Sequence, residues 1–328
     1  MTYSEYSFDS EVGAFFKKTA VIRATCDARA KELAGGSVAA VEVQGACSYT
    51  VYAGPELEYV VQFRLKSLAL KLDVVMCTVH LHRWYPLREL LEGGGGAALR
   101  HLMKRMRGIT HVDFIRVYGF PEDSPDNISW RKNLIEDIAQ YVSILAITDF
   151  AMFTPVSFDF RSSLANTYNR DLRLLQTALP SRFLPSIQTC IDSMNDILSC
   201  NIIVDEKTCH IVGVIDWAEA EVAPFGLNLH SLQSITGKLH LRDGWMRYRD
   251  FDSLQAIFWE NFSREAGGLP DNQLRTIKLA MILGLLLSHG FTRRLANEPE
   301  PVPIGDDEQG RYNMMTLDGF LINLDTRF

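Results

Sequence analysis

The sequence predicts an α+β protein with two lobes: a small antiparallel β lobe with one helix, followed by a larger, mainly helical lobe. Three β-type segments joined by short turns lie between residues 38 and 64, which is typical of an antiparallel meander. From about residue 129 onward the apolar residues recur mostly at helical spacing. The length of 328 residues fits two domains of ordinary size. We therefore expect a β-rich lobe over 1–104 and a helical lobe over 105–328.

The elements of the small lobe follow from a change in the period of the apolar residues. Near-helical spacing continues to Gly35, where a Gly-Gly pair ends the helix. The segments after it are rich in Val and Tyr and are separated by turns that contain Gly and Pro. We expect, in order, a helix over 11–35, strands over 38–43, 48–52 and 59–64, a helix over 68–82 and a strand over 97–106.

In the larger lobe a short strand pair interrupts the helices. Residues 202–204 and 211–215 predict the two arms of a hairpin. Antiparallel pairing then places Asn201 close to Asp216 at the open end of this hairpin. Asp196 lies one short loop earlier, so three oxygen-bearing side chains are expected to converge at one place.

This set of side chains suits Mg²⁺, which takes one or two protein oxygen ligands together with phosphate oxygens. An Asp and an Asn on the metal, with a separate Asp near the acceptor hydroxyl, is the arrangement that kinases use for phosphoryl transfer. Each residue also has an ordinary structural interpretation. Asp216 could cap the end of the strand, Asn201 could be a turn residue, and Asp196 could cap a helix.

The composition is that of a folded globular protein. Apolar residues make up 47% of the chain and charged residues 22%, so the chain can bury a large core without disulfides or metals. The 33 basic and 40 acidic residues give a net charge of −7 without a long run of Lys and Arg, which argues against a nucleic-acid partner. The six cysteines are scattered without a C-x-x-C pair, as in a reduced, cytoplasmic protein.

No segment of the sequence indicates a membrane partner. Met1–Ser10 is polar and acidic and lacks the basic-then-apolar order of a signal peptide. The most apolar stretch, Leu279–Leu287, is too short to span a bilayer and predicts a buried helix instead. The sequence carries no signal of oligomeric state.

The segment around the predicted hairpin resembles a known family. In Val214–Glu219 and Pro224–Gly226 the chain is similar to the aminoglycoside phosphotransferase and choline kinase-like family, in particular to its branch in filamentous fungi. The resemblance covers most of the chain from about residue 38 to 322. Further similarity lies in Tyr59–Arg64, Met106–Thr110, Trp130-Arg131, Asp137–Ala139 and Leu317–Leu321.

The resemblance implies a protein-kinase-like fold with ATP and Mg²⁺ as cofactors. Asp196 would be the catalytic aspartate that orients the acceptor hydroxyl. Asn201 and Asp216 would hold the metal, and the hinge between the lobes would lie near Lys104–Gly108.

Two parts of the chain depart from the family pattern. The catalytic loop of the family usually reads His-Gly-Asp, whereas this chain has Met194-Asn195-Asp196, and a Met side chain cannot brace the loop by hydrogen bonding. The strand that normally carries a phosphate-binding Lys places Gln62 and Arg64 on one face instead. Arg64 is therefore the expected cation, although Arg and Lys differ in geometry.

The turn before the second strand is expected to cover the phosphates. It runs from Gln44 to Ser48 and contains one glycine, Gly45, so its backbone is less free to approach a phosphate than that of a glycine-rich turn. The predicted nucleotide-binding residues are Gly45, Ser48, Gln62 and Arg64.

Two functional hypotheses follow. In the first, the protein is an ATP- and Mg²⁺-dependent phosphotransferase that acts on a small hydroxyl-bearing metabolite, in secondary metabolism. In the second, the kinase fold is kept but phosphoryl transfer is lost, and the protein binds a metabolite, acts as a scaffold or catalyses a different biosynthetic step. The joint presence of Asp196, Asn201 and Asp216 favours the first hypothesis. The expected partner is a small-molecule substrate.

Overall fold

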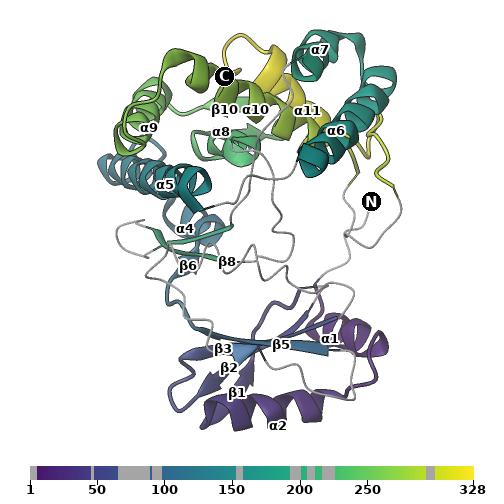
Figure 1. The fold of residues 1–328 in the computed structure, drawn as a ribbon. Coiled ribbons are helices and arrows are strands. Elements are labelled where there is room, and N and C mark those ends of the chain that lie inside the picture. Colours follow the sequence, from purple (N-terminus) through teal and green to yellow (C-terminus); the bar gives the residue numbers. More distant parts are fainter. Residues whose placement is uncertain are drawn as a thin grey trace. The chain divides into compact units, whose positions relative to one another are not determined.

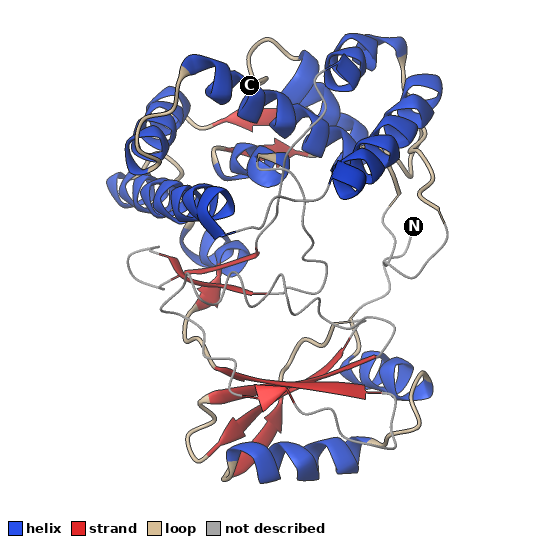
Figure 2. Cartoon of the chain, viewed as in Figure 1, coloured by secondary structure: helices blue, strands red, loops and turns tan. Residues whose placement is uncertain are grey.

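The computed structural model describes two compact units, whose elements are shown in Figures 1 and 2. The N-terminal unit contains the described residues up to Arg107, and the C-terminal unit those from Gly108 onward. The described residues are 6–45, 48–65, 89–90, 98–152, 158–192, 201–204, 211–215, 226–292 and 300–328.

The N-terminal unit is built on a five-stranded antiparallel sheet, with the strand order β1-β2-β3-β5-β4. Its first three strands confirm the predicted meander, and the strand predicted over 97–106 is β5. The helix predicted over 68–82 lies outside the described residues. The strands are β1 (Ser37–Ala40), β2 (Ser48–Gly54), β3 (Tyr59–Leu65), β4 (Glu89–Leu90) and β5 (Ala98–Lys104).

Two helices precede the sheet where the sequence predicted one over 11–35. They are α1 (Phe8–Lys17) and α2 (Arg23–Ala34). Between them, Oγ1 of Thr19 accepts a 3.0 Å hydrogen bond from the backbone N–H of Val21, so a side chain takes a donor that a continuous helix would need. The prediction of a single helix was therefore wrong, because β-branched residues and a competing side-chain hydrogen bond interrupt the run.

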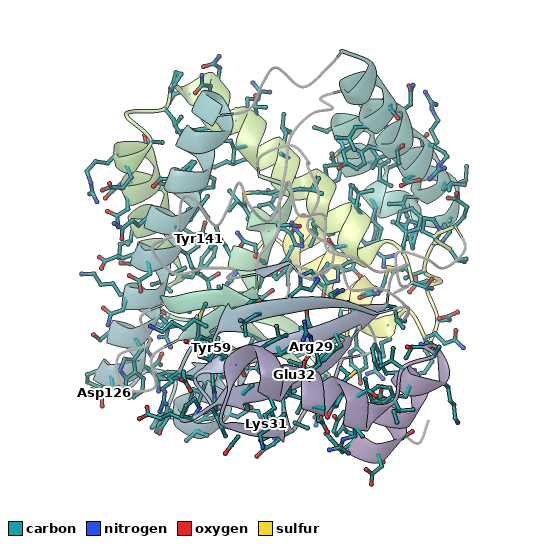
Figure 3. The ribbon with its side chains drawn as sticks, turned by 60° about the horizontal axis from the view of Figure 1, so that its bottom comes forward. Arg29, Lys31, Glu32, Tyr59, Asp126 and Tyr141 are labelled. Carbon is teal, nitrogen blue, oxygen red and sulfur yellow. The ribbon has the colours of Figure 1, made fainter. Side chains whose placement is uncertain are left out.

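Both helices pack on one face of the sheet. Val12 and Phe15 from α1, and Cys26 and Ala30 from α2, form a buried cluster with alternate residues of the strands. On α2, the partly exposed Arg29 pairs with Glu32 at 2.5 Å, one turn apart (Figure 3). The strand residues in this core are Tyr49, Val51, Ala53, Val61, Phe63, Leu65 and Leu102.

The C-terminal unit begins with a three-stranded antiparallel sheet of order β6-β7-β8. Its strands are β6 (Ile109–Thr110), β7 (Asn201–Val204) and β8 (Ile211–Ile215). The hairpin predicted over 202–204 and 211–215 is therefore confirmed, with β7 one residue longer.

The remainder of the C-terminal unit is mainly helical, as predicted. The stretch Leu279–Leu287 lies in α10, and Ala280, Met281, Leu285 and Leu286 are buried there, as expected of a core helix. None of the described helices is long and apolar enough to cross a bilayer. The α-helices are α4 (His111–Tyr118), α5 (Pro125–Met152), α6 (Phe158–Ala178), α7 (Leu184–Asp192), α8 (Leu232–Ile235), α9 (Phe251–Glu265), α10 (Asp271–His289) and α11 (Arg311–Leu317). Shorter helical segments are η2 (Ser181–Phe183), η4 (Leu227–Ser231) and the π-helical η5 (Asp318–Ile322).

One hairpin in this unit was not predicted. Strands β9 (Gly237–His240) and β10 (Gly244–Arg247) pair antiparallel in a region that the sequence predicted as mainly helical. A turn over residues 241–243 joins them, and Gly244 follows it with φ +83°, a left-handed conformation that favours glycine. The Asp243-Gly244 pair was the local signal for this turn.

Candidate active site

The face of the N-terminal sheet opposite α1 and α2 carries polar side chains. Residues on a strand alternate between faces, so Ser48 and Thr50 on β2 lie on the other side from the core residues Tyr49 and Val51. The register pairs Ser48 with Arg64, Thr50 with Gln62, and Gln62 with His101. Residues directly opposite one another in a pair share a face. We call these five residues the polar face: Ser48, Thr50, Gln62, Arg64 and His101.

Hydrogen bonds connect the polar face across two strands. Nη1 of Arg64 donates to Oε1 of Gln62 at 3.2 Å, and Nε2 of Gln62 donates to Oγ1 of Thr50 at 3.5 Å. The hydroxyls of Thr50 and Ser48 lie 3.3 Å apart. The structure therefore brings three of the predicted nucleotide-binding residues, Ser48, Gln62 and Arg64, into one network.

Arg64 is buried, with 2% of its surface exposed, although it carries a permanent positive charge. Burying a charge is unfavourable unless hydrogen bonds and opposite charges compensate it. A guanidinium in a place shielded from water attracts an anion more strongly than an exposed one does, because the local dielectric constant is lower. The polar face therefore combines a buried cation with an amide, two hydroxyls and an imidazole.

The segment that leads into β2 is fixed by Gln44. Its Oε1 accepts from the backbone N–H of Thr50 at 2.9 Å, and its Nε2 donates to the carbonyls of Val41 and Thr50, both at 2.9 Å. The backbone N–H of Ser48 is 3.5 Å from the carbonyl of Gly45. A Cβ added to Gly45 would meet no atom within 4 Å, so this backbone is open to the approach of a ligand.

His101 is a polar-face residue that the sequence did not single out. It is buried, with 1% of its surface exposed, and burial, followed by the charge of Arg64, lowers its pKa to about 4. Its position depends on the pairing of β5 with β3, in which it lies opposite Gln62. A polar residue inside a β-type segment, opposite another polar residue, was the only signal that could have identified it.

Of the predicted metal and catalytic residues, the structure describes Asn201, at the open end of the β7–β8 hairpin. Asn201, the first residue of β7, pairs with Ile215, the last residue of β8, and Asp216 follows Ile215 in the sequence. The hairpin therefore has the register on which the prediction of the metal site depended. Asp196 and Asp216 lie outside the described residues, so their convergence with the Asn201 side chain stays a prediction.

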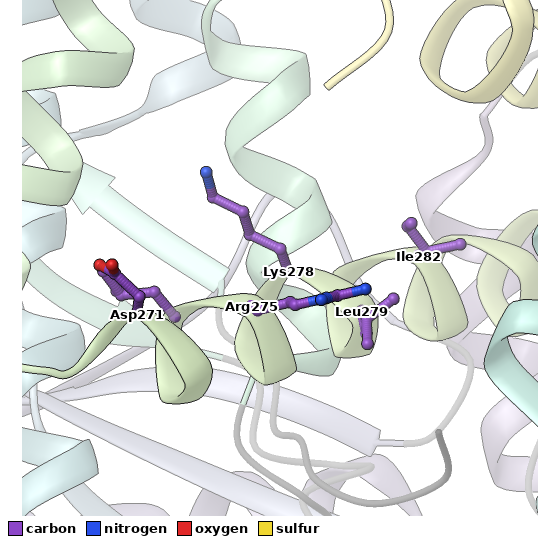
Figure 4. A pocket seen from close by; sticks show the side chains of 6 residues that line it. Asp271, Arg275, Lys278, Leu279 and Ile282 are labelled. Carbon is purple, nitrogen blue, oxygen red and sulfur yellow. The ribbon is translucent and has the colours of Figure 1, made fainter. Parts of the chain in front are cut away.

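A second surface feature is an open hollow along α10 (Figure 4). Its volume is about 320 Å³, and its lining side chains recur every three or four residues along one side of the helix. The hollow combines apolar side chains with one acid and two bases, and we assign no catalytic role to it. The lining residues are Asp271, Leu274, Arg275, Lys278, Leu279 and Ile282.

Comparison with solved structures identifies the fold. The chain matches a candidate aminoglycoside phosphotransferase from Ralstonia eutropha with a TM-score of 0.58, over 88% of this chain and 94% of that one, at 11% sequence identity. The chain has an aminoglycoside phosphotransferase-like kinase fold. The predicted α+β, kinase-like class is thus confirmed. At this level of identity the likeness establishes the fold alone.

Two further matches have TM-scores below 0.5. Ethanolamine kinase from Plasmodium vivax gives 0.46 at 14% identity, over 97% of this chain and 95% of that one. An aminoglycoside phosphotransferase in a ternary complex with streptomycin and ATP gives 0.47 at 13% identity, over 82% and 92%. No protein-family model and no curated protein sequence matches the chain.

Proposed function

We propose that the protein is an ATP- and Mg²⁺-dependent phosphotransferase whose acceptor is a hydroxyl group on a small metabolite. The observation that carries this proposal is the polar face, where a buried arginine, an amide and two hydroxyls form one hydrogen-bonded network on a kinase-like sheet. The resemblance in the sequence favours a metabolite of secondary metabolism.

Each residue has a role that its chemistry allows. Arg64 would neutralise charge on the phosphate oxygens, and Gln62 would hold the guanidinium in place. Ser48 and the backbone near Gly45 offer hydrogen-bond donors to the same phosphates. Bound ATP would supply the transferable phosphoryl group.

Asn201 and Asp216 would hold Mg²⁺ through their side-chain oxygens. Asp196 would orient the acceptor hydroxyl and accept its proton as the hydroxyl oxygen bonds to the γ-phosphorus of ATP and the bond from that phosphorus to ADP breaks. Met194 stands where the family usually has His, and a thioether has no hydrogen-bond donor to offer.

Thermal unfolding with and without Mg·ATP tests the proposal. Binding at 100 times Kd stabilises the folded protein by about 2.7 kcal/mol, so a clear upward shift of Tm is expected at millimolar nucleotide. Arg64→Met should abolish the shift. Arg29→Met removes an arginine on α2, on the opposite side of the sheet, and should leave the shift intact. Asp216→Ala should remove the dependence of the shift on Mg²⁺. The absence of any shift in the unmodified protein would overturn the proposal.

The second hypothesis, a kinase fold without phosphoryl transfer, is favoured by Gln62. This neutral amide occupies the alternative register for the cation of this strand, and it is hydrogen-bonded to Thr50 and Arg64. The two hypotheses differ in whether product forms. Consumption of ATP with a panel of amino alcohols and hydroxylated metabolites, lost in Asp196→Asn, supports transfer. Binding of a metabolite that is unaffected by Asp196→Asn supports the second hypothesis.

A further inference from the structure

His101 stands out among the buried polar side chains of the N-terminal unit. It lies in β5 opposite Gln62, and 1% of its surface is exposed. Within the part of the chain that the structure describes, neither Nδ1 nor Nε2 of His101 has a hydrogen-bond partner. Its neighbour in the sequence, Leu102, belongs to the apolar core on the opposite face.

An imidazole in this state is unfavourable for folding. Each buried donor or acceptor without a partner costs about 1–3 kcal/mol, and folded proteins leave few such groups unexplained. An aliphatic side chain of similar size would fill the same position without that penalty. Binding of a ligand by the imidazole would explain why position 101 carries a histidine in spite of this cost.

The surroundings of His101 indicate which ligand atom it would meet. The ring shares the polar face with Arg64, whose charge helps to keep the imidazole neutral. A neutral imidazole has one N–H donor and one acceptor nitrogen. An N–H group beside a guanidinium matches an anionic oxygen, because both donors can bind the same charged group.

We propose that His101 is a ligand-binding residue, which donates its ring N–H to a phosphate oxygen of a bound nucleoside polyphosphate. This inference rests on the proposed function and assigns to the same site a donor on β5, next to the cation on β3. His101 has no role in proton transfer in this proposal. It binds the phosphate and helps to position it.

Calorimetric titration of Mg·ADP into the unmodified protein, three His101 variants and one control variant tests this assignment. His101→Leu removes the donor while keeping an apolar side chain of comparable size. We expect it to weaken ADP binding about tenfold, which corresponds to about 1.4 kcal/mol. The Tm of the unliganded variant should not fall, because the substitution removes two unpaired polar atoms.

His101→Asn and His101→Gln return an amide donor near the positions of Nδ1 and Nε2. One of the two variants should recover part of the lost affinity for ADP. If His101 had only a structural role, neither variant would recover it. Leu102→Met, on the opposite face of the same strand, is the matched control and should bind ADP as the unmodified protein does.

The outcomes separate this inference from the proposed function. If the unmodified protein binds ADP and His101→Leu binds it equally well, the assignment of His101 is wrong while the proposed function stands. Loss of affinity in all three His101 variants points to shape and not to a hydrogen bond, and also overturns the assignment. If the unmodified protein binds no ADP, both proposals fail.

Discussion

The guanidinium of Arg64 donates to the amide oxygen of Gln62, two residues earlier on the same strand, at 3.2 Å. The positive charge therefore lies beside Gln62, although the cation is attached to the strand two positions later. Gln62 in turn donates to Thr50 on the neighbouring strand. The strand could carry its cation at position 64 or, in the alternative register, at position 62, and this hydrogen bond brings the cation of position 64 beside position 62.

This relationship predicts that the cation can be moved back along β3. Arg64→Gln should lose the stabilisation by Mg·ATP, because a neutral amide cannot offset phosphate charge. The double variant Gln62→Lys/Arg64→Gln should regain part of it, since positions 62 and 64 share a face. Thermal unfolding at several nucleotide concentrations measures both effects. A full ligand shift in Arg64→Gln would show that the site does not use this cation.

The network on the polar face was predictable where it depends on local pattern. Alternation along a strand placed Gln62 and Arg64 together, and the short turns gave the pairing of β2 with β3. The hairpin that aligns Asn201 with Ile215 followed in the same way from two apolar runs around one turn.

His101 could not be predicted in this way, because its burial depends on β5 pairing with β3 across a long intervening segment. The break between α1 and α2 also escaped prediction, since the apolar spacing continues through it. There a hydrogen bond from the Val21 N–H to the Thr19 side chain outweighs helix periodicity. The β9–β10 hairpin was missed because its strands are only four residues long and lie among helices.

A buried ion pair between Arg131 and Asp250 joins α5 to the residue before α9. Nε and Nη2 of Arg131 donate to the two carboxylate oxygens, each at 3.0 Å, and the two side chains are 10% and 13% exposed. Arg131→Met leaves the carboxylate buried without its cation, and we expect a loss of about 3 kcal/mol in the free energy of unfolding. Chemical denaturation followed by tryptophan fluorescence measures it.

The control for this prediction is an exposed pair. Arg264 and Glu265 lie 3.1 Å apart with 66% and 42% of their side chains exposed, so Arg264→Met should change stability by no more than about 0.5 kcal/mol. The double variant Arg131→Met/Asp250→Leu should be less destabilised than Arg131→Met, because no unpaired charge remains. If Arg131→Met and Arg264→Met lowered the free energy of unfolding equally, burial would not determine how much an ion pair contributes to stability.

The buried His230 predicts a dependence of stability on pH. Its Nδ1 lies 2.5 Å from the carbonyl of Leu227, and burial, with a smaller effect from His289, lowers its pKa to about 4. Between pH 6.5 and about 4 the unfolded chain therefore binds a proton that the folded protein excludes. The contribution to stability is complete above pH 6.5 and is lost as the pH falls toward 4.

This group should add about 1.4 kcal/mol per pH unit to the slope of unfolding free energy against pH in that range. His230→Asn keeps a donor for the Leu227 carbonyl but has no titrating ring, so its slope should be smaller by that amount. Above pH 7 the two proteins should differ by a constant free energy. If the curves of unfolding free energy against pH were parallel for the unmodified protein and His230→Asn between pH 4.5 and 6.5, His230 would not be held neutral in the folded protein.

Two glycines with opposite surroundings give the last prediction. A Cβ on Gly284 of α10 would lie 1.6 Å from the backbone carbonyl oxygen of Leu227 in η4, whereas a Cβ on Gly13 of α1 would meet nothing within 4 Å. Gly284→Ala must therefore push α10 and η4 apart, and we expect it to destabilise the protein by about 1–3 kcal/mol or more.

Gly13→Ala should instead stabilise the protein by about 0.5–1 kcal/mol, because alanine has the higher helix propensity and finds free space there. Circular dichroism melts of the two single variants measure the contrast. Helix propensity alone would give both substitutions the same sign, so a rise in Tm for Gly284→Ala would show that α10 does not contact η4 closely. We expect Tm to fall for Gly284→Ala and to rise for Gly13→Ala. That contrast would mean that position 284 requires glycine because the Leu227 backbone lies close to it, and not because it lies in a helix.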